Sequence, residues 1–409
     1  MLAEVFVEKA YNMAMGSVDF DSAELTQSFT LTEGGPGAAF LKQIHLVRPE
    51  WGAGLGRTAL ILAAITWAPL FVLCGFEGLL FGRVKMPFFY DIAAHTRFLV
   101  AVPVLVLADI PVGLSLRQVM GHFVGAHLVR DDELGKFEKI IRDSLRFRDS
   151  HVGEIIVLVV TYLATYNALF GASSQSGTWF RPETGQGLTL VGYWYALVAL
   201  PIFQFLIFRW IYRMAVWSRF LWKVSRLDLL LTPTHPDAAG GLAFVGKSLI
   251  PFGVILFAIS AVVSSGIAER ILFGGARLRE YQWSYLTLFV FALAIFAAPM
   301  LIFVPNLLVL KQRGLMEYGT LGSEYTQAFY RRWVGKTEPA EEPLLGTGDI
   351  QSLADLGNSF EIIRKMRILP VELSDFIAFV LPGLIPALPL AATVMPLGDI
   401  VKGLLKLIA

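Results

Sequence analysis

The chain has a single cysteine, Cys74, in 409 residues. One cysteine cannot form a disulfide within the chain, and it cannot supply the thiolates of a cysteine-based zinc cluster. Several catalytic signatures are also lacking: a glycine-rich phosphate loop ending in Lys-Ser/Thr, His-Glu-x-x-His and Gly-x-Ser-x-Gly. These absences lower the expectation of an enzyme without removing it, since a membrane enzyme need not carry any of these motifs.

Charge is scarce and nearly balanced. Charged residues make up 16% of the chain, the net charge is +1, and 55% of the residues are hydrophobic, with a mean hydropathy of +0.61. The near-zero net charge gives no reason to expect a nucleic-acid partner. Seven nearly uncharged runs approach or reach the roughly 20 residues that cross a bilayer as a helix. They are 58–82, 98–116, 155–171, 188–208, 249–268, 284–310 and 376–397.

These runs predict an all-α membrane protein, a bundle of about seven transmembrane helices in the lipid bilayer. Residues 1–56 are expected to form an N-terminal segment, and residues 57–409 one transmembrane domain with insertions at 117–154, 209–248 and 311–375. The last run contains four prolines, which remove backbone donors and break helices. Six spans plus a proline-rich re-entrant hairpin are therefore the alternative.

Lysine and arginine are distributed unevenly between the runs. Residues 1–57 and the three insertions together hold 25 of the 34 Lys and Arg residues. Positively charged residues concentrate on the cytoplasmic side of membrane proteins. The bias therefore predicts a cytoplasmic N-terminus and three cytoplasmic insertions.

Two insertions contain the pattern of amphipathic helices. Apolar residues recur three or four positions apart between basic residues, at Leu134, Phe137, Ile140, Ile141 and Leu145 in the first insertion and at Leu353, Leu356, Phe360 and Ile363 in the third. We expect these helices to pack on the protein in the cytoplasm. A position on the anionic leaflet of the membrane is the alternative.

Few ionisable residues lie inside the apolar runs, and Asp109 is the deepest. It stands in the second run between Pro103 and Pro111, where a proline-loosened helix leaves backbone carbonyls without donors. A carboxylate in hydrocarbon is costly, so it is a functional candidate by default, here for a cation or proton site. The alternative is a structural carboxylate that is neutral or paired with a neighbouring helix.

Four other polar residues in the runs are further candidates for an ion or solute pathway: Glu77, Asn167, Gln204 and Asn306. Glu77 is expected either to line an outer vestibule or to reach the interface. Polar side chains on membrane helices more often join helices than line a pore, and this alternative stays open for the other three.

The most distinctive soluble stretch is residues 232–246, in which two prolines and the pair Gly240 and Gly241 predict a shaped loop. His235 and Asp237 can bind a metal or accept a proton. A metal site usually has three or more protein ligands, and the nearby sequence offers no obvious third. The alternative is that Asp237 caps the following helix while His235 bonds to the backbone.

Three stretches resemble a group of bacterial polytopic inner-membrane proteins for which no activity is known. They are residues 232–246, the DIQSLADLGNSF segment at 349–360, and the ending at 389–408 with MPL at 395–397 and LLKL at 404–407. Together they cover under an eighth of the chain. The resemblance implies a bacterial inner membrane location and nothing about mechanism.

Three functions follow as hypotheses. The first is a channel or transporter for a small ion or solute, motivated by Asp109 and by the proline-interrupted runs. The second is a signalling or scaffold protein that recruits a cytoplasmic partner through residues 232–246 and the amphipathic helices. The third is a membrane-embedded enzyme acting on lipid, with His235 and Asp237 at the interface. The sequence assigns no cofactor and leaves open whether the chain forms a homo-oligomer.

Overall fold

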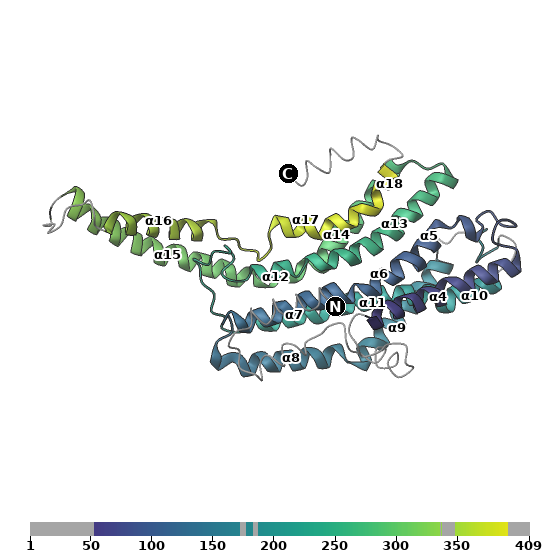
Figure 1. Ribbon diagram of the computed structural model, residues 1–409, viewed down its shortest axis with the longest axis horizontal. Coiled ribbons are helices and arrows are strands. Elements are labelled where there is room, and N and C mark those ends of the chain that lie inside the picture. The colour runs from purple at the N-terminus through teal and green to yellow at the C-terminus, as the bar shows by residue number, and fades with distance from the viewer. Residues whose placement is uncertain (1–52, 172–176, 183–186, 336, 338–347, 392–409) are drawn as a thin grey trace.

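The computed structural model describes residues 53–171, 177–182, 187–335, 337 and 348–391. Nearly all of the predicted N-terminal segment and most of the resembling ending lie outside these residues. In the described residues the chain forms helices and no strand, with isolated bridges only at Met86–Thr178 and Val129–Leu229. The predicted all-α membrane bundle is confirmed (Figure 1).

Six helical stretches are long and apolar enough to cross a membrane. The first three are α4 (Ala53–Glu77), the run of α5 (Ile92–His95), η2 (Thr96–Ala101), α6 (Val102–Leu107) and α7 (Asp109–Gly125), and α9 (His151–Phe170). The next two are α10 (Leu190–Trp194), η4 (Tyr195–Ala199) and α11 (Leu200–Val224), then α12 (Ala243–Lys247), η5 (Ile250–Phe252) and α13 (Gly253–Gly274). The sixth contains α17 (Leu373–Leu384), η9 (Ile385–Ala387) and α18 (Leu388–Ala391).

A seventh span exists if one bent pair of helices counts as a single crossing. The pair consists of η6 (Leu278–Tyr281) and α14 (Gln282–Phe296), followed after a 44° bend by η7 (Ala298–Phe303), α15 (Val304–Phe329) and η8 (Tyr330–Val334). Pro299 and Pro305 both follow the break at Ala297, and each lacks a backbone donor. The segment that bends is therefore the sixth apolar run of the sequence. The proline-rich seventh run, for which a re-entrant hairpin was the alternative, forms a helical stretch long enough to span.

Three helical stretches are longer than the hydrocarbon thickness requires. They contain 34, 35 and 32 residues, or roughly 50 Å of helix against about 30 Å of hydrocarbon. Hydropathy marks where a helix leaves the hydrocarbon, but backbone hydrogen bonding carries the helix on into water. For this reason the predicted insertion 209–248 begins as a continuation of α11, which ends at Val224.

The bundle has two distinct ends (Figure 1). At the end that we call the loop end, the connections after α4, α9 and α13 meet: Met86 bridges to Thr178, and Tyr90 packs on Phe273 with 5.7 Å between ring centroids. The opposite end, which we call the arm end, carries α8 (Leu134–Arg148), α12 and a projecting helical hairpin.

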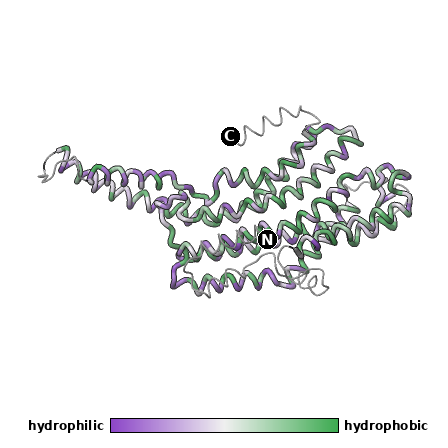
Figure 2. Tube along the Cα trace, viewed as in Figure 1, coloured by the Kyte–Doolittle hydropathy of each residue, from purple (hydrophilic) through white to green (hydrophobic). Residues whose placement is uncertain are grey.

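The projecting hairpin, here called the arm, consists of α15, η8 and α16 (Asp349–Lys365). Two hydrogen bonds to Asp349 join the two sides of this hairpin. The Tyr325 hydroxyl donates to the Asp349 backbone carbonyl at 3.1 Å, and Trp333 Nε1 donates to Asp349 Oδ2 at 2.8 Å. The predicted apolar stripe of α16 faces α15, and Ile363 at its base is fully buried. Figure 2 shows hydrophilic and hydrophobic residues alternating along the arm, against a mostly hydrophobic region around α4 and α10.

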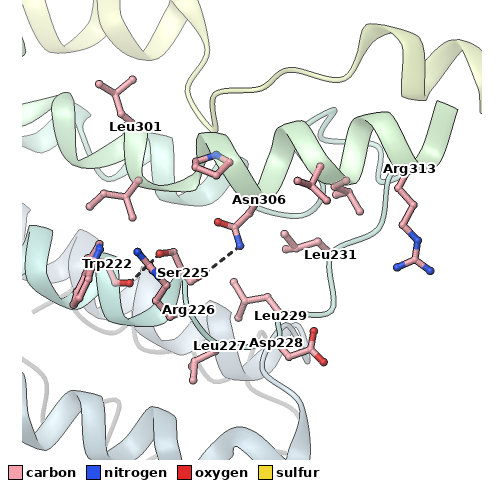
Figure 3. Close-up of a pocket in the computed structure, with 14 residues that line it drawn as sticks. Trp222, Ser225, Arg226, Leu227, Asp228, Leu229, Leu231, Leu301, Asn306 and Arg313 are labelled. Carbon is pink, nitrogen blue, oxygen red and sulfur yellow. Dashed lines mark hydrogen bonds between the residues drawn. The ribbon is translucent and has the colours of Figure 1, made fainter. Parts of the chain in front are cut away.

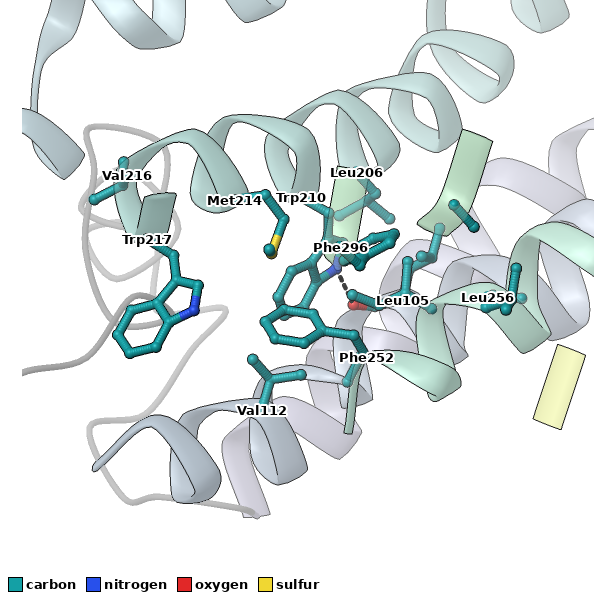
Figure 4. Close-up of a cluster of buried hydrophobic side chains, with 14 of the residues drawn as sticks. Leu105, Val112, Leu206, Trp210, Met214, Val216, Trp217, Phe252, Leu256 and Phe296 are labelled. Carbon is teal, nitrogen blue, oxygen red and sulfur yellow. Dashed lines mark hydrogen bonds between the residues drawn. The ribbon is translucent and has the colours of Figure 1, made fainter. Parts of the chain in front are cut away.

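The centre of the bundle is an aromatic and aliphatic cluster (Figure 4). Trp210 of α11 packs on Phe252, with 6.3 Å between ring centroids, and its Nε1 donates to the carbonyl of Leu105 at 3.0 Å. That carbonyl belongs to α6, next to the break between α6 and α7. A buried indole N–H needs such a partner. Here the hydrogen bond connects α11 to the second spanning stretch, close to the break between α6 and α7.

The amphipathic helix α8 packs on α11, as its apolar spacing predicts. Phe137, Ile140 and Ile141 are buried against the bundle. Lys223 of α11 pairs with Asp143 of α8, with 3.0 Å between Nζ and Oδ2. The structure therefore shows that α8 packs on the protein and not on lipid alone.

Candidate functional site

Asp109, the deepest carboxylate in the predicted spans, is paired. Its Oδ1 accepts a hydrogen bond from Arg213 Nη1 at 2.5 Å, and its Oδ2 accepts one from Nη2 at 3.3 Å, between α7 and α11. The exposed fractions of the two side chains are 12% and 5%. The Arg213 guanidinium also lies over Trp210, 4.6 Å from the ring centroid. The structure thus shows a bidentate buried ion pair, the structural alternative that the sequence left open.

The other pathway candidates occupy separate places. Glu77, at the end of α4, accepts hydrogen bonds from the first backbone N–H groups of α10, those of Leu190 at 3.0 Å and Val191 at 3.5 Å. A carboxylate at the positive end of a helix is stabilised there. Gln204 accepts a hydrogen bond from Thr165 at 2.7 Å and so joins α11 to α9.

Asn167 and Asn306 complete the set of predicted pathway residues. Asn167 is exposed on α9. Asn306 donates to the backbone carbonyl of Ser225 at 3.1 Å and so joins α15 to the end of α11. Three of the four side chains therefore connect two elements each, the role that polar groups on membrane helices most often have.

In residues 232–246, Asp237 organises the loop through its carboxylate. Oδ1 accepts the backbone N–H groups of Ala239 at 2.8 Å and Gly241 at 3.1 Å, and Oδ2 accepts that of Ala243 at 3.0 Å at the start of α12. His235 Nδ1 lies 2.8 Å from Asp237 Oδ1, close enough for a protonated Nδ1 to donate to the carboxylate. Both carboxylate oxygens are thus engaged within the loop itself.

Two opposing effects act on the pKa of Asp237. Burial raises it by penalising the charged form, but the backbone N–H groups of Ala243, Ala239 and Gly241 and the His235 side chain outweigh burial. The pKa of Asp237 is therefore lowered, and the carboxylate is held ionised. His122 lies near enough to His235 and Asp237 to interact with both electrostatically. Among the described residues, however, no group of three His, Cys, Asp or Glu side chains is arranged to hold a metal ion.

The same loop fastens the arm to the bundle. Arg367, just after α16, donates through Nη2 to the carbonyl of Asp237 and through its backbone N–H to the carbonyl of Ala238, both at 2.7 Å. Gly240 has a φ of 66°, and a Cβ there would lie 2.6 Å from Leu310 of α15. Glycine is needed at this position both for its conformation and for the close approach of α15. We call residues 232–246 the joint loop.

A group of polar side chains that sequence reasoning missed lies near the loop end. Arg97 in η2 donates through Nη1 to the hydroxyl of Tyr195 in η4 at 2.6 Å. Both elements are π-helical turns inserted into long α-helices. Such turns are rare and occur frequently at functional sites. Arg97 Nε is buried, and none of the described residues accepts a hydrogen bond from it.

Asp91 and Glu269 interact electrostatically with this pair, and His95 lies in α5, directly before η2. Glu269 of α13 interacts electrostatically with Asp91 and with Arg97. Asp91 accepts hydrogen bonds from Trp179 Nε1 at 2.8 Å and from the backbone of α5, and His95 Nδ1 accepts one from Trp67 Nε1 at 2.9 Å. We call the five residues the polar cluster: Asp91, His95, Arg97, Tyr195 and Glu269. It gathers both signs of charge between α5, η2, η4 and α13.

One signal in the sequence points to this cluster. Asp91, His95 and Arg97 fall within seven residues at the beginning of the second spanning stretch. Glu269 and Tyr195 belong to other helices, and only packing brings them to the same place.

A comparison with protein-family models, curated proteins and solved structures finds no match for this chain.

Proposed function

We propose that this integral membrane protein transports a small ion or solute across the bacterial inner membrane and that the polar cluster is its binding site. The observation that carries the proposal is the convergence of Arg97, Tyr195 and Glu269 from three separate spanning stretches, with Arg97 and Tyr195 each in a π-helical turn. Ionisable residues are costly within a membrane bundle and mark ion or substrate pathways more often than elsewhere.

The polar cluster supports this role better than Asp109 does. Asp109 already has a bidentate partner, and Trp210 covers the other side of Arg213. In the cluster, by contrast, Arg97 keeps a buried donor for which the described residues provide no acceptor, and Glu269 faces both a positive and a negative neighbour. A site with such unmet hydrogen-bonding capacity can exchange partners with a bound ion or solute.

The test is flux in proteoliposomes of purified protein, scanning K⁺, Na⁺, Cl⁻ and H⁺. We expect Glu269→Gln, which keeps the shape of the side chain and removes its charge, to reduce flux by about tenfold or more. The matched control is Glu138→Gln on α8, which makes the same chemical change at an exposed ion pair with Arg142. Thermal melting and size-exclusion profiles establish that each variant is folded.

Two outcomes contradict the proposal. One is the absence of flux for every probe ion in vesicles that contain well-folded wild-type protein in both orientations. The other is unchanged flux in a folded Glu269→Gln, Arg97→Gln double variant. The pair variant Asp109→Asn, Arg213→Gln separates the two candidate locations: loss of flux there, with flux retained in Glu269→Gln, would return the pathway to Asp109.

A second candidate function is recruitment of a cytoplasmic partner by the arm. Several large apolar side chains of the arm are exposed, and Met316 is the most exposed of them at 76%. They are Met316, Leu321, Tyr330, Val334 and Ile350. Crosslinking in intact membranes, comparing the wild type with Met316→Ser, Leu321→Ser, distinguishes this function: a partner that the variant loses supports recruitment. The joint loop is a weaker docking segment than the sequence suggested, because Ala239 and Leu242 in it are fully buried.

A further inference from the structure

A groove opens at the arm end, between the end of α11 and the beginning of α15 (Figure 3). Its volume is about 770 Å³, and its lining includes Trp222, Arg226, Asn306 and Arg313. Asn306 points across it toward Ser225, to whose carbonyl it donates. The groove lies beside the 44° bend, where the bent pair of helices leaves its straight course.

The groove is amphipathic along its length. Leu301 and Val309 form part of its lining and are exposed, Val309 at 63%. Trp222, also exposed, lies in the last turns of the spanning stretch that ends at Val224. Tryptophan is enriched at the level of the lipid headgroups, because its ring is apolar and its N–H is polar.

The polar part of the groove is positively charged. Arg226 lies over the Trp222 ring at 5.1 Å, and within the described part of the chain no carboxylate is within ion-pair distance of it. Arg313 pairs with Glu317 at 2.7 Å, in an exposed contact on the solvent side of α15. The one acidic residue of the lining, Asp228, is held by Arg130 at 3.2 Å.

We propose that this groove binds one anionic phospholipid, with its phosphate at Arg226 and an acyl chain along Leu301 and Val309. Arginine recognises phosphate oxygens through its several donors, and the positive-inside bias assigns this end to the leaflet where basic residues meet anionic lipid. A soluble phosphate compound would leave the exposed apolar lining uncovered, so a lipid fits both halves of the groove. The proposal is independent of the transport function.

The test is native mass spectrometry of the purified full-length protein titrated with phosphatidylglycerol or with phosphatidylcholine. We expect wild-type protein to retain one phosphatidylglycerol, and Arg226→Gln to weaken its binding by about fivefold, the effect of one arginine near the headgroup. The matched control is Arg142→Gln, which removes one exposed, ion-paired arginine elsewhere. It is expected to bind the lipid as the wild type does.

A second variant tests the apolar half without changing charge. Val309→Trp fills the groove while Arg226 remains, and we expect it to lose the lipid as well. Equal binding of the two lipids, equal loss in the control variant, or full binding by Val309→Trp would each overturn the proposal. Displacement of the lipid by millimolar glycerol phosphate would overturn the assignment to a phospholipid, since the acyl chain would then contribute nothing.

Discussion

Removing one member of the Asp109–Arg213 pair should destabilise the bundle much more than removing both. In Asp109→Asn the Arg213 guanidinium, whose side chain is only 5% exposed, keeps its charge but loses its carboxylate. Leaving one buried charge unpaired costs about 3–5 kcal/mol in soluble proteins. The contact with Trp210 remains in the variant and does not replace the carboxylate.

In the double variant Asp109→Asn, Arg213→Gln, neither charge is buried and two amides face each other. We expect its free energy of unfolding to lie within about 1–2 kcal/mol of the wild type, because pairs of buried charges contribute little net stability once desolvation is counted. The double-mutant cycle should therefore give a coupling energy of at least about 2 kcal/mol.

Reversible unfolding in mixed micelles, followed by tryptophan fluorescence, measures these free energies. The same cycle on the exposed pair Glu138–Arg142 of α8, whose ion-pair distance is 3.4 Å, provides the reference. Exposed pairs of this spacing contribute about 0.3–0.5 kcal/mol. A coupling energy for Asp109–Arg213 no larger than this reference would refute the view that the pair holds α7 to α11.

Two further predictions concern the joint loop and its surroundings. Asp237→Ala should destabilise the protein by about 2 kcal/mol or more through loss of three charge-assisted backbone hydrogen bonds. Because the folded-state pKa of Asp237 is lowered, this stabilisation is complete above the ordinary carboxyl pKa and is lost as the pH falls through the folded-state value. A difference in the free energy of unfolding between wild type and variant that stays the same from pH 7 to pH 3 would contradict this prediction. Gly246→Ala should cost about 1–3 kcal/mol, since its Cβ would meet the Pro370 carbonyl and lie 2.8 Å from Val371 Cα. Gly266→Ala in α13, with nothing within 4 Å of its Cβ, is the matched control and should not destabilise.

Most of the fold could be predicted because its signals are local. The apolar runs predicted the spanning helices, and the apolar spacing predicted both α8 and the face of α16 that meets α15. The ends of the helices were less predictable: the second run was expected at 98–116, whereas its helical stretch covers Ile92–Gly125. Hydropathy reports contact with hydrocarbon, and a helix continues beyond it wherever backbone hydrogen bonds can be kept.

The candidate site was less accessible to sequence reasoning. Asp109 was recognisable as unusual, because a lone carboxylate in an apolar run stands out without any knowledge of its neighbours. Its partner is 104 residues away, in a part of α11 that hydropathy assigned to a soluble insertion. In the polar cluster, Glu269 and Tyr195 each look like ordinary residues near a helix end, so their proximity to Arg97 could not be predicted.

The sequence by itself determined that this is a multi-pass α-helical membrane protein, because transfer of each apolar run into hydrocarbon depends on that run's own composition. It also determined which carboxylates and basic residues are costly to bury. Only the tertiary structure decided what those residues do, since the partner of a buried charge depends on how helices pack. Packing placed Arg213 on Asp109, brought Glu269 to Arg97 and turned residues 232–246 into the joint that holds the arm.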